Sequence, residues 1–162
     1  MDARTPAMPP ITVVIADHKR ARRAACLRLL ELTRGIRVVG EAHTEMDAIA
    51  ALWLRPRILL LDLTLSRDAA LLLPLIRLRS PQTRVILFTE GASERRVLDA
   101  LAYGASGYLE KKLVHAFLAK AVRQVDAGEA WVPRRMVSKV VERLRALRPE
   151  GVPAQASSRP DL

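Results

Sequence analysis

The chain has 162 residues, of which 50% are apolar, so it is long and apolar enough for one domain with a buried core and is not a largely disordered protein. Its longest apolar runs, ILLLDLTL and LLLPLI, fall short of the roughly 20 residues of a membrane span, and MDARTPAMPP has no apolar signal-peptide core. The net charge of +10 suggests that the protein binds nucleic acid. Against this, the basic residues are scattered along the chain, and only 4% of residues are aromatic, which leaves few side chains to stack on bases. We therefore expect a cytoplasmic protein with no membrane contact and no specific DNA binding from this chain alone.

Five short apolar runs alternate with longer amphipathic stretches. The runs predict strands over 11–16, 37–42, 57–62, 84–89 and 107–109. The stretches between them predict helices over 19–33, 44–54, 67–79, 93–103 and 112–127. In the first helix we expect the core face to be Ala21, Ala24, Ala25, Leu29 and Leu32. This alternation is typical of a doubly wound α/β domain with a five-stranded parallel sheet and right-handed crossovers.

The pattern changes after residue 128. Residues 129–148 predict a basic amphipathic helix or linker, with Met136, Val140, Leu144 and Leu147 on one side. The segment after it is rich in Pro, Ser and Ala and has no periodicity, so 149–162 is interpreted as a disordered tail. The first ten residues are interpreted as a disordered N-terminus, which leaves 11–128 as the domain.

Four polar side chains follow strands of the predicted sheet. They are Asp17, Asp62, Thr89 and Lys111. In a doubly wound sheet the ligand site lies beyond the carboxyl ends of the strands, where the strand order reverses. The set suits phosphoryl transfer onto a carboxylate, with Asp62 as the nucleophile and the Thr89 hydroxyl and Lys111 ammonium on the phosphoryl oxygens. Asp17, Asp62 and the backbone carbonyl of Thr64 would offer Mg²⁺ the oxygen ligands it prefers.

Two other phosphate sites fit the sequence less well. A haloacid-dehalogenase-type phosphatase also uses a strand-end Asp nucleophile, but it needs a second Asp where this chain has Thr64. A flavodoxin needs a Ser/Thr/Gly-rich phosphate loop after the first strand, and DHKRARR is not one.

Several stretches together resemble the receiver domain of bacterial response regulators, in the NarL/FixJ-type branch. They are VVIAD, RVVGEA, LLLDL, RVILFT, GASGYLEK and VDAGEAWVP, which cover about residues 11–133. The resemblance implies a flavodoxin-like sheet of order 2-1-3-4-5 followed by an extra C-terminal helix. It also implies that Asp62 is the phospho-acceptor, that Thr89 and Tyr108 are the switch residues, and that Lys111 is the catalytic lysine. The expected partner is a sensor histidine kinase, and the expected role is signalling, with no enzymatic activity beyond self-catalysed phosphotransfer and dephosphorylation.

The chain departs from this family at two site positions. His18 stands where the family has a second acid that helps to hold Mg²⁺, and an imidazole nitrogen is a poor ligand for so hard an ion. Glu90 follows Thr89 where a small residue is usual, and it would crowd or repel a phosphate donor. We therefore expect weakened Mg²⁺ binding. His43 and His115 are interpreted as surface or packing residues.

Three functions follow as hypotheses. The first is a phosphorelay receiver that accepts a phosphoryl group on Asp62. The second is a phosphorylation-independent pseudo-receiver, which binds a protein partner without Mg²⁺ chemistry. The third is a truncated DNA-binding transcriptional regulator, because 129–162 is too short for a helix-turn-helix. A homodimer remains a further hypothesis, since the C-terminal helix would pack either on the domain or on a second copy.

Overall fold

A computed structural model describes residues 7–148, in which five parallel strands form one sheet of order β2-β1-β3-β4-β5. The strands are β1 (Ile11–Ala16), β2 (Ile36–Ala42), β3 (Ile58–Asp62), β4 (Arg84–Thr89) and β5 (Gly107–Glu110). The helices are α1 (Arg20–Glu31), α2 (Glu45–Ala51), α3 (Ala69–Arg79), α4 (Glu94–Ala102), α5 (Val114–Asp126) and α6 (Val137–Ala146). Short 3₁₀ turns are η1 (Leu52–Leu54), η2 (Leu63–Leu65), η3 (Lys111–Leu113) and η4 (Arg134–Met136). The predicted fold class and strand order are confirmed.

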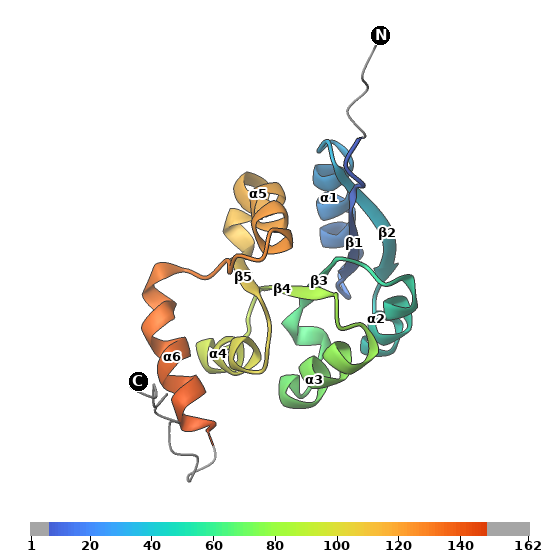
Figure 1. The fold of residues 1–162 in the computed structure, drawn as a ribbon. Coiled ribbons are helices and arrows are strands. Elements are labelled where there is room, and N and C mark those ends of the chain that lie inside the picture. The colour runs from blue at the N-terminus through green and yellow to red at the C-terminus, as the bar shows by residue number, and fades with distance from the viewer. Residues whose placement is uncertain (1–6, 149–162) are drawn as a thin grey trace, which may run out of the picture.

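Both faces of the sheet are covered, which is why its strands are near-continuous apolar runs. Helices α1 and α5 lie on one face, and α2, α3 and α4 lie on the other (Figure 1). The central strand β3 shows the alternation, because Leu59 and Leu61 pack with the second group of helices while Ile58 and Leu60 pack with the first. All of β3 is buried, so the Asp62 carboxylate at its carboxyl end is surrounded by neighbouring protein groups rather than by solvent.

The buried face of α1 agrees only in part with the predicted one, since Leu29 packs against the core but Ala21 is exposed. Its fully buried residues are Cys26 and Leu30, whereas Leu32 lies just beyond the helix end and is 87% exposed. The periodicity of small alanines was misleading because Ala21 lies on the exposed side of the helix. Cys26 is buried, and desolvation raises the pKa of its thiol to about 11.

The C-terminal segment runs from α5 back across the sheet edge and ends in α6 beside α4 (Figure 1). On the way, Trp131 bridges to Gly107 of β5, and a Cβ at Gly107 would lie only 3.2 Å from Trp131. Met136, the last residue of η4 just before α6, is buried, and Val140 packs against the same core, but Leu144 is 45% exposed.

Within the C-terminal segment 129–148, a bridge at Trp131 and η4 precede the helix. The predicted position of Leu144 on the packed side is wrong, because its place is taken by Arg143, which pairs with Asp99 of α4. The expected disordered segments 1–10 and 149–162 fall mostly outside the described residues. Within residues 7–148 no helix has the length and apolar character needed to cross a membrane.

Candidate functional site

Two carboxylates lie side by side at the carboxyl edge of the sheet. Asp17 directly follows β1 and Asp62 ends β3, and these two strands are hydrogen-bonded neighbours. Both side chains are fully buried. Two buried acids in contact would repel each other unless cations or donors balance them, so the surroundings of this pair decide what the site can do.

A single arginine balances the pair. Arg22, in the first turns of α1, donates from Nε to Asp17 and from Nη2 to Asp17 Oδ1 at 2.8 Å and to Asp62 Oδ2 at 2.5 Å. Its side chain is only 8% exposed, and its guanidinium lies 5.6 Å from the centre of the Phe88 ring. The hydrogen bond that Arg22 donates to Asp17, ahead of the opposing cost of burial, raises the pKa of Arg22 further above its ordinary value. Arg22 therefore carries a permanent positive charge between the two acids.

Asp62 is also held by the turn that follows it. The backbone N–H of Thr64 donates to Asp62 Oδ1 at 3.0 Å, and its hydroxyl donates to Asp62 Oδ2 at 2.9 Å. On the far side of that turn, Arg96 of α4 donates to the carbonyl oxygens of Ser66 at 2.5 Å and Leu63 at 3.3 Å. The acceptor loop is thus tied to α4 by a residue that the sequence did not single out.

His18 lies at the mouth of the pair. Its Nδ1 is 3.3 Å from Asp62 Oδ2 and 3.7 Å from Asp17 Oδ1, and about half of its side chain is exposed. Asp17, His18 and Asp62 each offer an atom within 4.8 Å of the others, so the three are close enough to share an ion.

The chemistry of this donor set does not fit Mg²⁺. The ion requires six oxygen ligands in near-octahedral geometry and binds imidazole nitrogen poorly. Here the third group is His18, and Arg22 donates to three of the four carboxylate oxygens of the pair. A cationic guanidinium already occupies the position between the acids where a metal ion would have to sit.

The second half of the site lies around β4 and β5. Thr89, Glu90, Tyr108 and Lys111 line a wide, open cavity of about 520 Å³. Thr89 is 5% exposed, and its hydroxyl has no hydrogen-bond partner among the described residues. Lys111 Nζ pairs with Glu90 Oε2 at 2.5 Å, and this hydrogen bond lowers the pKa of Glu90. Burial, more than the nearby charge of Glu110, raises the pKa of Tyr108.

The structure therefore divides the predicted site residues into two groups. Asp17, His18 and Thr64 gather around Asp62, which Arg22 joins to Asp17, whereas Lys111 is turned to Glu90. Sequence reasoning missed Arg22, although a signal was present. Cys26 and Leu30 mark the buried stripe of α1, and the position four residues before Cys26 on that stripe is Arg22.

The remaining histidines lie elsewhere. His43 is exposed and lies 3.2 Å from Asp47 on α2, and His115 is exposed on α5. Neither joins the strand-end groups.

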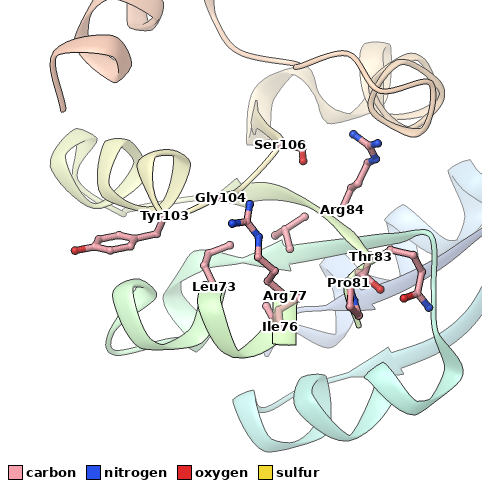
Figure 2. A pocket seen from close by; sticks show the side chains of 11 residues that line it. Leu73, Ile76, Arg77, Pro81, Thr83, Arg84, Tyr103, Gly104 and Ser106 are labelled. Atoms are coloured by element: carbon pink, nitrogen blue, oxygen red, sulfur yellow. The ribbon is translucent and has the colours of Figure 1, made fainter. Parts of the chain in front are cut away.

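Another hollow lies at the opposite edge of the sheet. This cavity of about 220 Å³ lies beside the start of β4. Figure 2 shows Arg77 and Arg84 on its walls and Ser106 above. Arg77 reaches towards Gly104, whose φ is +117°. The hollow contains none of the strand-end residues and no carboxylate, so it is separate from the acid pair.

Comparison with known proteins agrees with this geometry. The response regulator receiver domain family matches residues 13–123. The DNA-binding transcriptional activator DevR/DosR of Mycobacterium tuberculosis is 33% identical over 134 residues, which are 82% of this chain and 61% of that protein. The nitrate/nitrite response regulator NarL of Escherichia coli K12 is 33% identical over 141 residues, or 86% of this chain and 65% of that protein. The chain thus spans less than two thirds of the length of these relatives.

Solved structures give the same result. The receiver domain of the putative response regulator NarL from M. tuberculosis superposes with a TM-score of 0.69 at 29% identity, over 75% of this chain and 99% of that chain. A LuxR-family two-component response regulator from Aurantimonas superposes with a TM-score of 0.70 at 26% identity, over 85% of this chain and 99% of that chain. With the sheet order and the strand-end acids, these matches show that the chain belongs to the response-regulator receiver family.

Proposed function

We propose that this chain is a phosphorelay receiver that accepts a phosphoryl group on Asp62 from a sensor histidine kinase in the cytoplasm. The observation that carries the proposal is the buried hydroxyl of Thr89, at the edge where Asp62 ends its strand, which has no hydrogen-bond partner within residues 7–148. Arg22 Nη1 is a second buried donor at that edge that makes no hydrogen bond to any residue the structure describes. Buried unpaired polar groups are rare, and a phosphoryl group has the acceptor oxygens to satisfy both.

The chemistry is a transfer between two nucleophiles. A carboxylate oxygen of Asp62 forms a new bond to phosphorus while the P–N bond of a phosphohistidine breaks, and the imidazole nitrogen leaves with the electron pair. Such transfers depend on positioning and on positive charge around the phosphoryl oxygens. Arg22 supplies one such charge beside Asp62, and Lys111 supplies another once it leaves Glu90.

A second candidate is a phosphorylation-independent interaction module. It is favoured by the pairing already present, in which Arg22 balances both acids and Glu90 holds Lys111. In that case the protein acts through its surface in the state described above, and no phosphoryl group is needed.

A third candidate is that this chain is the receiver part of a longer DNA-binding regulator. It is supported by the name of the mycobacterial relative, a DNA-binding transcriptional activator, and by the 61% of that protein which the chain covers.

Intact-mass measurement after incubation with acetyl phosphate or phosphoramidate tests the first candidate. We expect one added phosphoryl group on the parent and none on Asp62→Asn. Asp68→Asn is the matched control, because Asp68 is an exposed acid in the same loop and Asn also caps a helix such as α3. No added mass on the folded parent would favour the interaction module, and equal labelling of Asp62→Asn would place the acceptor elsewhere.

A further inference from the structure

We propose that Arg22 is a built-in replacement for the divalent cation of this site, so that the chain binds no Mg²⁺ at its acid pair and Asp62 works with a guanidinium instead. The inference concerns the same site as the proposed function and rests on it for the role of Asp62. Its first part, the exclusion of the metal, stands on the geometry alone.

The first step is the position of the guanidinium. One nitrogen, Nη2, contacts a carboxylate oxygen of each acid, at 2.8 Å for Asp17 and 2.5 Å for Asp62. A cation that bridges both acids must lie between those same oxygens, so Arg22 and a metal ion cannot occupy the site together.

The second step is the strength with which Arg22 is held. Its side chain is 8% exposed, stacks near Phe88 and donates charge-assisted hydrogen bonds to two fully buried acids. Removing one partner from a buried ion network leaves an uncompensated charge, which is far costlier than breaking a surface pair. A metal ion would have to expel Arg22 and then bind with one ligand replaced by the nitrogen of His18.

The third step is the charge that Arg22 leaves available. Its Nη1 is buried, has no hydrogen bond among the described residues and lies 3.6 Å from Glu90 Oε2. A guanidinium has five N–H donors in a planar fork that suits phosphate oxygens. Arg22 therefore offers both functions that the cation would serve at this pair, the neutralisation of the acids and a positive contact for a phosphoryl oxygen.

Calorimetric titration with MgCl₂ tests the exclusion directly, with thermal unfolding at increasing Mg²⁺ as an independent measurement. We expect no binding and no metal-dependent rise in Tm for the parent. Arg22→Met removes the guanidinium and keeps much of the side-chain volume, so we expect it to bind Mg²⁺ measurably, at least about 10-fold more tightly than the detection limit that the parent sets, the scale of losing or gaining support around a metal site. Arg28→Met, on the exposed side of the same helix, removes the same charge and should behave as the parent.

His18→Asp separates the two residues. If Arg22 excludes the metal, this variant binds Mg²⁺ as poorly as the parent, and the double variant with Arg22→Met binds it more tightly than Arg22→Met alone. Tight Mg²⁺ binding by the parent, or full recovery in His18→Asp alone, would overturn the inference. If Arg22→Met fails to fold, the parent and His18→Asp titrations still test the inference, because tight Mg²⁺ binding by either protein would overturn it.

Labelling with acetyl phosphate in the presence and absence of EDTA separates this inference from the proposed function. We expect labelling that EDTA does not reduce. Labelling that EDTA abolishes would keep the proposed function and refute the role of Arg22. No labelling, with no Mg²⁺ binding by the parent, would refute phosphoryl acceptance and leave the exclusion of the metal supported.

Discussion

Glu90 determines the direction in which Lys111 points. The pair lies at 2.5 Å, and Lys19 lies 3.5 Å from the same Glu90 oxygen. Lys111 is thereby drawn to the exposed side of the Thr89 cavity, and a negative charge stands beside the path of an anionic phosphate donor. A unit charge about 4 Å from another is worth about 1 kcal/mol in water, which is about fivefold in rate.

We therefore predict that Glu90→Gln is labelled by acetyl phosphate about fivefold faster than the parent, because the repulsion is lost and Lys111 is released. The rate of mass gain measures the effect. Glu129→Gln, an exposed acid after α5, is the control for a change of net charge. A slower Glu90→Gln would mean that Glu90 positions Lys111 usefully rather than restraining it.

At the scale of elements, α6 behaves as part of the domain because its contacts with α4 are both apolar and charged. Met136 is 1% exposed, while Lys139 pairs with Glu94 at 2.7 Å and Arg143 with Asp99 at 2.5 Å. Exposed ion pairs contribute little, so the buried Met136 should hold the segment in place.

Truncation of that side chain tests this point. We predict that Met136→Ala lowers the free energy of unfolding by about 2–5 kcal/mol, the range for deleting a large buried side chain. Val141→Ala, on the outer side of α6 and 40% exposed, should cost less than about 0.5 kcal/mol. Urea unfolding of both variants measures the difference, and equal small losses would show that α6 is only loosely attached.

The attachment of α6 should also depend on pH through Glu110. The hydrogen bond from Arg135, ahead of the opposing effect of burial, lowers the pKa of this carboxyl. A lowered folded-state pKa stabilises the contact above the ordinary carboxyl pKa of about 4.3, and this stabilisation is lost as pH falls through the lower folded value.

We predict that acidification below about pH 4.3 loosens the segment around Trp131 in the parent but has a smaller effect in Glu110→Gln. Trp131 fluorescence in a Trp53→Phe background measures this loosening. The backbone carbonyl of Trp131 accepts a hydrogen bond from the backbone N–H of Tyr108 on β5 at 2.7 Å, so Trp131 lies in the segment that is expected to loosen. Identical pH profiles in the two proteins would show that Glu110 does not cause the pH dependence of this segment.

At the scale of the whole molecule, the sheet was predictable and the charge arrangement of the site was not. Strands such as β3 and β4 are apolar along most of their length because both faces are covered, and this pattern can be recognised from one sequence alone. The position of Asp17 and Asp62 follows from the strand ends. Arg22 could not be inferred from composition, because several arginines share α1 and only the helix phase set by Cys26 and Leu30 shows which of them turns inward.

The net charge of +10 belongs to the whole chain, and its distribution argues against recognition of a DNA sequence. The basic helix α6 is the natural candidate for a DNA groove, yet Lys139 and Arg143 are paired with acids of α4, and Arg135 is paired with Glu110 of β5. Contacts from scattered arginines would reach phosphates rather than base edges, and phosphate contacts carry no sequence information.

We therefore predict that this chain binds unrelated DNA duplexes with affinities equal within about twofold, because the attraction is electrostatic. If about five phosphates are neutralised, raising the salt from about 50 to 200 mM should weaken binding by about 10²- to 10³-fold through counterion release. Fluorescence anisotropy of two labelled duplexes across this range measures both effects. Lys139→Ala and Arg143→Ala should leave the affinity nearly unchanged, since those charges are already paired. A tight, sequence-selective complex at about 0.15 M salt would show instead that α6 leaves α4 to bind DNA.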